Sequence, residues 1–391
     1  MMKKNTDTNF YIPQIQKRNK LARRFKYTTL AAVILSLSFL GFFLFDIIKT
    51  GYPAFQQSYV KVEITFDEET ASNPYGIFDK TMNKLISRAW LRSLPQEIEK
   101  NPQWIGTTQT FWALLNAEAD QHIKGKFSRL DDSLKSKIEE LLLKGEIEKR
   151  LNVIFFFTGD SKIPENAGFY SAIIGSVLTM IVTMTLAVPI GVMTAIYLEE
   201  FAPDNKITQI IEVNINNLAA IPSILFGLLG LAIFINFFGV PRSSPLVGGM
   251  TLALMSLPII IVSSKAALKS VPASIRQAGY GLGLTKWQVT KDHVLPLAFP
   301  GILTGSIIAL AQAMGETAPL IIVGMIAFVP DAVTNITSAA TVMPAQIFTW
   351  SGMPERAYIE KTAAGIIVLL TVLISLNTLA VILRKKFEVK W

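Results

Sequence analysis

The chain has 391 residues, of which 51% are hydrophobic and 17% are charged, and its mean hydropathy is +0.41. Soluble domains carry about 25% charged residues, so this composition excludes an ordinary soluble protein over the whole length. No Cys is present, which excludes a disulfide framework and a thiolate metal site. His122 and His293 are far apart and lack the spacing of metal ligands, so no metal or other cofactor is expected.

Six stretches are long and apolar enough to cross a bilayer, which takes about 20 residues in a helix. The first is longer than the core of a signal peptide, about 7–15 residues, and no small-x-small cleavage site follows Asp46, so we expect a retained anchor rather than a cleaved signal. The fold class expected is an all-α polytopic membrane protein with six transmembrane helices. The stretches are Thr28–Ile48, Ser171–Tyr197, Val213–Phe238, Leu246–Ser264, Phe299–Ala327 and Thr362–Leu383.

The basic residues indicate the orientation of the chain in the membrane. Segment 1–27 holds eight Lys and Arg, and the loop after the fourth stretch holds five more. The short loops on the opposite side hold only Arg242, Arg356 and Lys361. Because cytoplasmic loops carry the excess of Lys and Arg, the N-terminus and the tail at 384–391 are both predicted to be cytoplasmic. The net charge of +8 is therefore a topology signal and does not indicate nucleic-acid binding.

Residues 49–165 form a predicted extracytoplasmic insert with 16 basic and 17 acidic residues. Val60–Phe66 alternates apolar and polar residues, which is typical of a half-buried strand. Ile77–Leu94 and Leu130–Asn152 are predicted to be helical, with Asp131, Asp132 and Ser133 at the start of the second helix. We expect a small α/β or mainly helical domain. Its function is not specified by any motif, and docking of an extracytoplasmic partner is one hypothesis.

The predicted cytoplasmic loop at 265–297 has an unusual sequence. A short helix after Pro272 should break at Gly281 and Gly283, and Thr285 is a plausible N-cap for a second helix. The segment resembles the EAA loop of ABC-importer permeases, which docks on the ATPase subunit. Ala278, Gly283, Leu295 and Pro296 match that pattern, whereas Gln277, Gly279 and His293 depart from it. An ordinary basic loop is the alternative. The residues that the resemblance assigns to ATPase coupling are Arg276, Gln277, Ala278, Gly279, Gly283, Leu295 and Pro296.

Glu316 lies inside the fifth apolar stretch. A carboxylate at the centre of a membrane helix costs about 2.5–3.5 kcal/mol on insertion scales, so it usually faces a cavity or a partner. Gln312 is four residues away and should share its helix face, near Gly305 and Ala309. Pro319 should kink or open the helix, and broken helices with polar residues often mark transporter binding sites. A buried structural Glu, protonated or paired, is the alternative.

A second polar segment opens the third apolar stretch. Asn214, Asn216 and Asn217 are costly in lipid unless they form hydrogen bonds. They are expected either to line a polar path or to cap a helix and hold its neighbours.

The run Ala313–Leu320 contains Gly-Glu-Thr-Ala-Pro-Leu and resembles the signature of the PstA/PstC phosphate permeases. The resemblance covers roughly residues 150–391, and the insert resembles an extension of a longer PstA subgroup. Many relatives have Arg where this chain has Gln312, and Glu316 is assigned to gating or to an ion pair. The resemblance implies a permease core at 166–383 of the ABC-importer type. Its predicted path residues are Gln312, Glu316, Thr317, Pro319, Asn214 and Asn217.

The resemblance also implies a set of partners: a second, PstC-like permease, two PstB-like cytoplasmic ATPases, an extracytoplasmic PstS-like binding protein and the lipid of a bacterial inner membrane. No Gly-x4-Gly-Lys-Ser/Thr loop is present, so we expect a transporter subunit without its own ATPase site and no enzyme. The predicted function is import of phosphate by alternating access. The alternatives are an importer of molybdate or sulfate, a membrane sensor or scaffold, and an intramembrane enzyme that uses Glu316.

Overall fold

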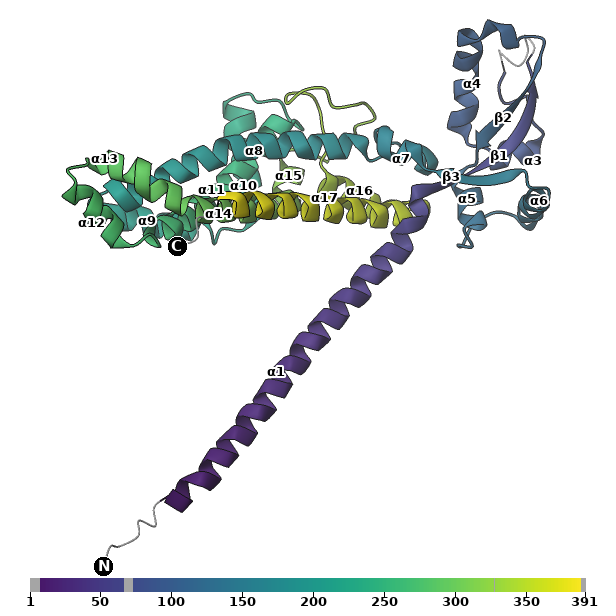
Figure 1. Cartoon of the computed structure of the whole chain (residues 1–391). Coiled ribbons are helices and arrows are strands. Elements are labelled where there is room, and N and C mark those ends of the chain that lie inside the picture. The colour runs from purple at the N-terminus through teal and green to yellow at the C-terminus, as the bar shows by residue number, and fades with distance from the viewer. Residues whose placement is uncertain (1–7, 67–72, 327, 388–391) are drawn as a thin grey trace, which may run out of the picture. The chain divides into compact units, whose positions relative to one another are not determined.

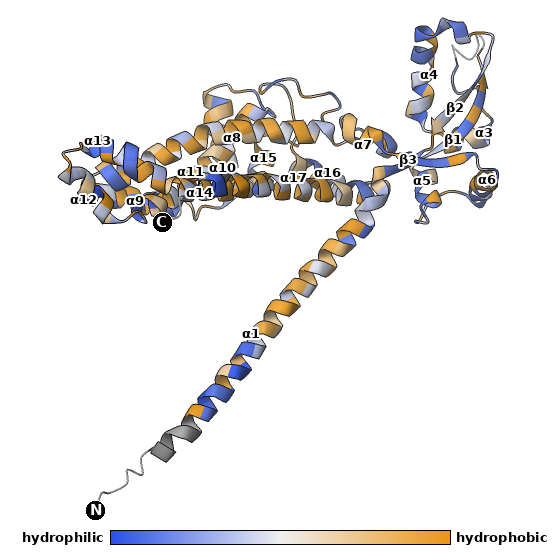
Figure 2. Ribbon diagram, in the orientation of Figure 1, coloured by the Kyte–Doolittle hydropathy of each residue, from blue (hydrophilic) through white to orange (hydrophobic). Residues whose placement is uncertain are grey.

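The computed structural model describes residues 8–66, 73–326 and 328–387, which divide into two compact units, 1–50 and 51–391. The first unit is helix α1 (Thr8–Gly51), whose 44 residues span about 66 Å at 1.5 Å per residue. The hydrocarbon core of a bilayer is about 30 Å thick, so roughly half of α1 extends beyond it. Figure 2 shows a hydrophilic N-terminal half of this helix and a hydrophobic C-terminal half.

The insert is built on a three-stranded antiparallel sheet with the order β2-β1-β3 (Figure 1). In β1, Val60, Val62 and Ile64 are buried while Lys61 and Glu63 alternate with them. This alternation is the pattern from which a strand was predicted. The strands are β1 (Gln56–Thr65), β2 (Thr108–Leu114) and β3 (Ile147–Leu151).

Short helices complete the insert, and both helices predicted there were too long. The first is interrupted at Ile86 and Ser87, where Ile86 pairs with Leu115 in an isolated bridge. The second ends at Leu143, since Gly145 turns the chain with a φ of 70° into β3. The helices are α3 (Lys80–Leu85), α4 (Arg88–Lys100), α5 (Ala117–Ile123), α6 (Asp132–Leu143) and α7 (Val153–Phe157), with single turns at Tyr52–Phe55, Pro102–Trp104 and Pro164–Asn166.

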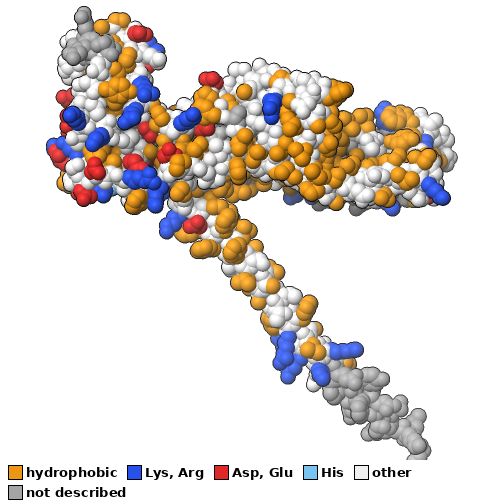
Figure 3. Space-filling model, turned by 180° about the vertical axis from the view of Figure 1, so that it is seen from behind, with side chains coloured by type: hydrophobic (Ala, Val, Ile, Leu, Met, Phe, Trp, Pro, Cys, Tyr) orange, Lys and Arg blue, Asp and Glu red, His pale blue; other side chains and the backbone are white. Residues whose placement is uncertain are grey.

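Four long helices form most of the membrane core: α8 (Tyr170–Ile196), α11 (Pro245–Lys269), α14 (Leu295–Gly315) and α17 (Ala357–Phe387). Small residues let them pack closely, as is usual between membrane helices. A Cβ on Gly249 would lie 2.5 Å from the Val182 side chain, and Thr183 Oγ1 donates to the Gly249 carbonyl at 3.2 Å. Figure 3 shows hydrophobic side chains over much of this core and charged side chains gathered on the insert.

The third apolar stretch does not form the continuous span that was predicted. It consists of α9 (Lys206–Leu218), α10 (Ser223–Leu229) and a π-helix (Gly230–Phe237), with a bend of 105° between α9 and the segment that follows. Pro222 has no N–H to donate and restricts the residue before it, so the helix stops there. Among the described residues, five helices are long and apolar enough to cross a membrane, and the bent pair makes six if it counts as one span.

The fifth stretch ends earlier than predicted. Helix α14 stops at Gly315, and Glu316 follows in an extended conformation with φ −73° and ψ 134°. The chain resumes as α15 (Ala318–Ile322), turns at Gly324 with a φ of 94°, and continues without regular structure to α16 (Met343–Ser351). A break near Pro319 was expected. The break lies at Glu316, three residues before Pro319. Pro319 is in the first turn of α15, where a residue without an N–H is tolerated, so the interruption comes before it.

Gly249→Val is expected to destabilise the core by about 1–3 kcal/mol, as overpacking does, because the added side chain meets Val182. The measurement is the thermal unfolding midpoint of the detergent-purified protein. Gly41→Val is the matched control, since nothing lies within 4 Å of a Cβ there. Equal midpoints for the two variants would contradict the packing described.

Candidate functional site

The loop between α11 and α14 folds into two short helices. Helix α12 (Ala273–Gly281) starts after Pro272 and ends in a Schellman motif, in which Leu284 N–H donates to the Gly279 carbonyl at 3.1 Å. Gly283, with a φ of 80°, occupies the left-handed position that this motif requires. The sequence placed the break and its glycine correctly.

The second short helix is α13 (Lys286–Val289), followed by a π-helical turn (Thr290–Val294) into α14. Thr285 is its N-cap, as predicted, and forms a capping box with Gln288. Val289 packs against α12 so closely that a Cβ on Gly279 would lie 2.7 Å from it. This contact gives a physical reason for the Gly at a position where the EAA pattern has Ala.

Arg276 joins this loop to the rest of the core. Its guanidinium donates to Glu200 Oε1 at 2.6 Å and to the carbonyls of Leu268 and Val271 at 3.0 and 2.8 Å. Glu200 follows α8 in a π-helical turn (Tyr197–Phe201), and its side chain is 4% exposed. The hydrogen bond to Glu200 raises the pKa of Arg276. Arg276 therefore points into the core, away from the surface that a partner would contact.

Neighbouring charges extend this contact. Lys265 on α11 forms ion pairs with Glu199, at 3.9 Å, and with Glu212 of α9. The acidic residues of these pairs were not predicted as site residues. In the sequence, Glu199 and Glu200 stand out only as two adjacent acidic residues at the end of an apolar stretch. That pattern does not indicate which basic residues they pair with.

The outer surface of the loop carries unpartnered apolar side chains. Leu282, Trp287 and Tyr280 are 82%, 59% and 44% exposed. The other predicted coupling residues divide between the surface and the interior: Gln277, Ala278, Gly283 and Pro296 are exposed, Leu295 is half-buried and Gly279 is buried.

The predicted path residues lie around two helix breaks. Glu316 and Thr317 are half-buried between α14 and α15, and Pro319 is buried against α10, where a Cβ on Gly227 would lie 2.7 Å from the Pro319 Cα. The bend before α10 and the break before α15 are therefore close in space. Gln312 is exposed near the end of α14.

Gln312 and Glu316 do not share one helix face, contrary to the prediction, because α14 ends between them. Gly305 and Ala309 are buried, and Gly305 faces Ser263 of α11, so they provide helix packing within this chain. Within residues 8–66, 73–326 and 328–387, Glu316 forms no ion pair.

The three Asn residues lie on α9 and are exposed. Asn214 Nδ2 donates to the Ile210 carbonyl at 2.7 Å within the same helix. Asn217 lies at the end of α9, so it does not cap the start of a helix there. The described residues show no contact that brings Asn214 or Asn217 to Glu316.

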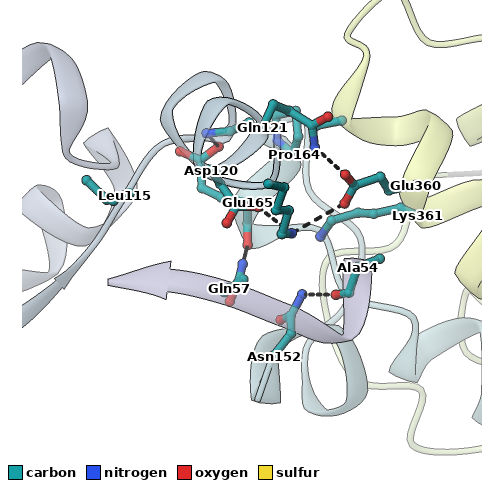
Figure 4. A pocket seen from close by; sticks show the side chains of 13 residues that line it. Ala54, Gln57, Leu115, Asp120, Gln121, Asn152, Pro164, Glu165, Glu360 and Lys361 are labelled. Carbon is teal, nitrogen blue, oxygen red and sulfur yellow. Dashed lines mark hydrogen bonds and ion pairs between the residues drawn. The ribbon is translucent and has the colours of Figure 1, made fainter. Parts of the chain in front are cut away.

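A buried polar junction joins the insert to the start of α17. Glu360, which is 3% exposed, accepts from Gln121 Nε2 at 2.8 Å, and lies 3.3 Å from Lys124 Nζ and 2.6 Å from Lys126 Nζ. Lys361, 5% exposed, donates to the Ala167 carbonyl just before α8. A cavity of about 20 Å³ lies at this junction. Figure 4 shows Gln121, Glu360 and Lys361 among the side chains that line it. Sequence analysis did not identify this junction, because its partners are 194 to 239 residues apart.

Residues 187–389 match the family described as the inner membrane component of binding-protein-dependent transport systems. The chain belongs to this family. It is a multi-pass permease of the ABC-transporter type, a class that works with ATP-binding and substrate-binding partners. Residues 13–81 and 76–132 match a second family, a domain of unknown function named DUF3333.

Curated relatives support the same placement of this permease. It is 32% identical to the phosphate transport system permease protein PstA 1 of Mycobacterium tuberculosis over 57% of the chain and 73% of the relative. PstA of Yersinia pestis is also 32% identical, over 59% of the chain and 78% of the relative. The match to the probable ABC transporter permease YqgI of Bacillus subtilis, again 32% identical, covers 44% of the chain and 58% of that protein. The resemblance to PstA permeases that the sequence motifs suggested is confirmed.

Arg276→Gln is expected to destabilise the permease by about 3 kcal/mol, since removing one partner of a buried pair leaves an uncompensated charge on Glu200. The double variant Arg276→Gln/Glu200→Gln should be less destabilised than the sum of the single variants. Thermal unfolding midpoints of all three variants measure this coupling. Lys291→Gln, an exposed change in the same loop, is the control, and additive effects of the pair would argue against the contact.

Glu360→Gln is expected to loosen the insert, because Lys124 and Lys126 lose their shared carboxylate while the contact with Gln121 is retained. Limited proteolysis of the detergent-purified protein should then cut the connections around residues 152–168 severalfold faster than in the parent. Glu355→Gln, at an exposed position just before α17, is the control. Unchanged cleavage of Glu360→Gln would show that the junction does not depend on this charge.

Proposed function

We propose that the chain is the permease subunit of an ATP-driven importer of inorganic phosphate. The observation that carries the proposal is the α12–α13 loop, fixed to the core by Arg276 and Glu200 and exposing Leu282 and Trp287 on its outer surface. Exposed apolar side chains in a polar loop mark a surface that a partner covers. We assign this surface to a cytoplasmic ATPase, which places both termini of the chain in the cytoplasm.

The mechanism that this geometry supports is alternating access. A rigid contact at Arg276 would pass a movement of α12 directly to the end of α8, while Lys265 links α8, α9 and α11. Through Lys265, the movement of α12 and α8 would also reach α9. Helix α9 leads to the bend before α10, and α10 packs on α15 after the α14 break. ATP-driven closure of the partner subunits would therefore change the geometry at the two breaks.

The two helix breaks are the proposed translocation path. Backbone groups freed at Glu316 and Pro222 are tolerated within a membrane only where protein or water satisfies them. Gln312 and Asn217 present neutral amide donors, which suit an oxyanion that must be released again. Glu316 carries a charge that repels phosphate, so we assign it to gating or to an ion pair with the second permease.

Phosphate as the substrate rests on the PstA relatives. The partner set that follows is a PstC-like permease, two PstB-like ATPases and a PstS-like binding protein delivering phosphate from outside. A PstC relative from Pasteurella multocida, 30% identical over 58% of the chain, supports a related second permease. Arg is absent at position 312, so recognition of the anion would depend largely on the binding protein.

Gly283→Trp and Glu316→Gln are each expected to reduce uptake of radiolabelled phosphate by cells more than tenfold at unchanged amounts of the permease in the membrane. The first places bulk on the proposed ATPase-binding surface, and the second removes the carboxylate at the helix break. The controls are Gly145→Trp, at an equally open glycine with a φ of 70°, and Glu139→Gln on exposed α6.

Normal uptake by both variants would refute these site assignments. Unlabelled sulfate and molybdate, added in separate arms, identify the transported anion. Competition by either one as effective as that of phosphate would overturn the substrate proposal and leave the importer mechanism standing.

A further inference from the structure

The insert contains a groove of about 370 Å³ between α3, α4 and the start of α5. Pockets of roughly 300–1,000 Å³ are the size at which proteins hold small molecules. None of the residues that line the groove is among those assigned to the translocation path. Its lining residues are Asn83, Lys84, Ile86, Arg88, Arg92, Asn116, Ile163 and Glu165.

Three of these residues are cations without a counter-ion. Lys84, Arg88 and Arg92 are exposed, and none of them forms an ion pair with a carboxylate in the described parts of the chain. Arg88 and Arg92 are four residues apart on α4 and therefore share one face. The positive charge of this groove contrasts with the near-neutral composition of the insert as a whole.

The single carboxylate in the groove, Glu165, is 8% exposed and is already used by the protein. Its Oε2 accepts from the Ala117 N–H at 3.2 Å, and it also lines the cavity at the junction with α17. With Glu165 counted, the formal charge of the lining is still +2. An anion in the groove would meet a positive potential and find guanidinium donors free to bind it.

The walls of the groove are held in place without a ligand. Asn116 caps α5 through the Ala119 N–H and donates to the Lys84 carbonyl at 2.5 Å, which fixes the end of α3 against α5. Arg92 Nε donates to Tyr75 Oη at 2.8 Å, which orients its guanidinium. Little conformational entropy is lost when a ligand enters a groove that is already formed.

We propose that this groove binds a small soluble oxyanion with several negatively charged oxygens, of the phosphate or oligophosphate class. Lys84 contacts it from α3, and Arg88 and Arg92 contact it from α4. Because Glu165 lines both the groove and the junction cavity, occupancy acts on the contact between the insert and α17. The proposal does not depend on phosphate being the transported substrate.

The test uses the full chain in nanodiscs of zwitterionic lipid, with inorganic phosphate and tripolyphosphate as probes and binding measured by calorimetry at about 0.15 M salt. Arg88→Gln/Arg92→Gln should bind either anion at least about tenfold more weakly, since each substitution removes a charge-assisted hydrogen bond to the anion. Lys84→Gln should weaken binding of either anion about threefold. This single variant provides the test if the double variant unfolds.

Lys100→Gln/Lys137→Gln removes two charges outside the groove, from the exposed Lys100 on α4 and the half-buried Lys137 on α6, and is the matched control. Glu139→Gln, at an exposed position of the insert outside the groove, should bind like the parent. Equal binding by the parent and the groove variants, or an equal loss in the matched control, would overturn the proposal. So would a parent chain that binds neither anion but retains an acidic binding protein through these arginines, because the groove would then be a protein-docking surface.

Discussion

The ion pair between Arg276 and Glu200 is the contact on which the α12–α13 loop of the permease depends. Glu200 is buried, and Arg276 pairs with it while also donating to the carbonyls of Leu268, in the last turn of α11, and Val271, just beyond it. A loop of two short helices has little core of its own. This guanidinium therefore adds a polar connection between α12 and the end of α8 to the apolar packing of Val271, Ile275 and Val289.

The two helix breaks follow from a second constraint, that backbone groups in a membrane must be satisfied within protein or water. Pro222 and the extended Glu316 each interrupt a helix at apolar sequence, where lipid contact would be costly. Packing of α10 on α15 at Gly227 and Pro319 buries the start of α15 beside the Glu316 break, whereas Ala219, Ala220 and Pro222 at the bend are exposed on this chain. Polar residues are tolerated at such breaks where protein or water surrounds them. A translocation path for an anion requires that condition.

Local signals in the sequence predicted local structure well. The Gly283 break, the Thr285 cap and the alternation of Val60, Val62 and Ile64 each depend on neighbours within a few residues, and all were found. Hydropathy alone treated 213–238 and 299–327 as continuous spans, because it does not register that a proline can start a new helix as well as kink one. Contacts such as Glu360 with Lys124 and Lys126 could not be predicted, because nothing in either segment specifies its distant partner.

Helix α8 connects the two charged contacts of the molecule. Its first turn follows Ala167, which accepts from Lys361 at the insert junction, and its last turn leads to Glu200. Its 27 residues extend about 40 Å, more than the roughly 30 Å of a bilayer core. The junction and the α12 contact therefore lie at opposite ends of a helix that is long enough to cross a bilayer. Helix α8 contains Pro189 and ends in a π-helical turn, both of which favour bending. It is nevertheless one continuous helix, so it provides a covalent connection between the insert junction and the loop that Arg276 holds.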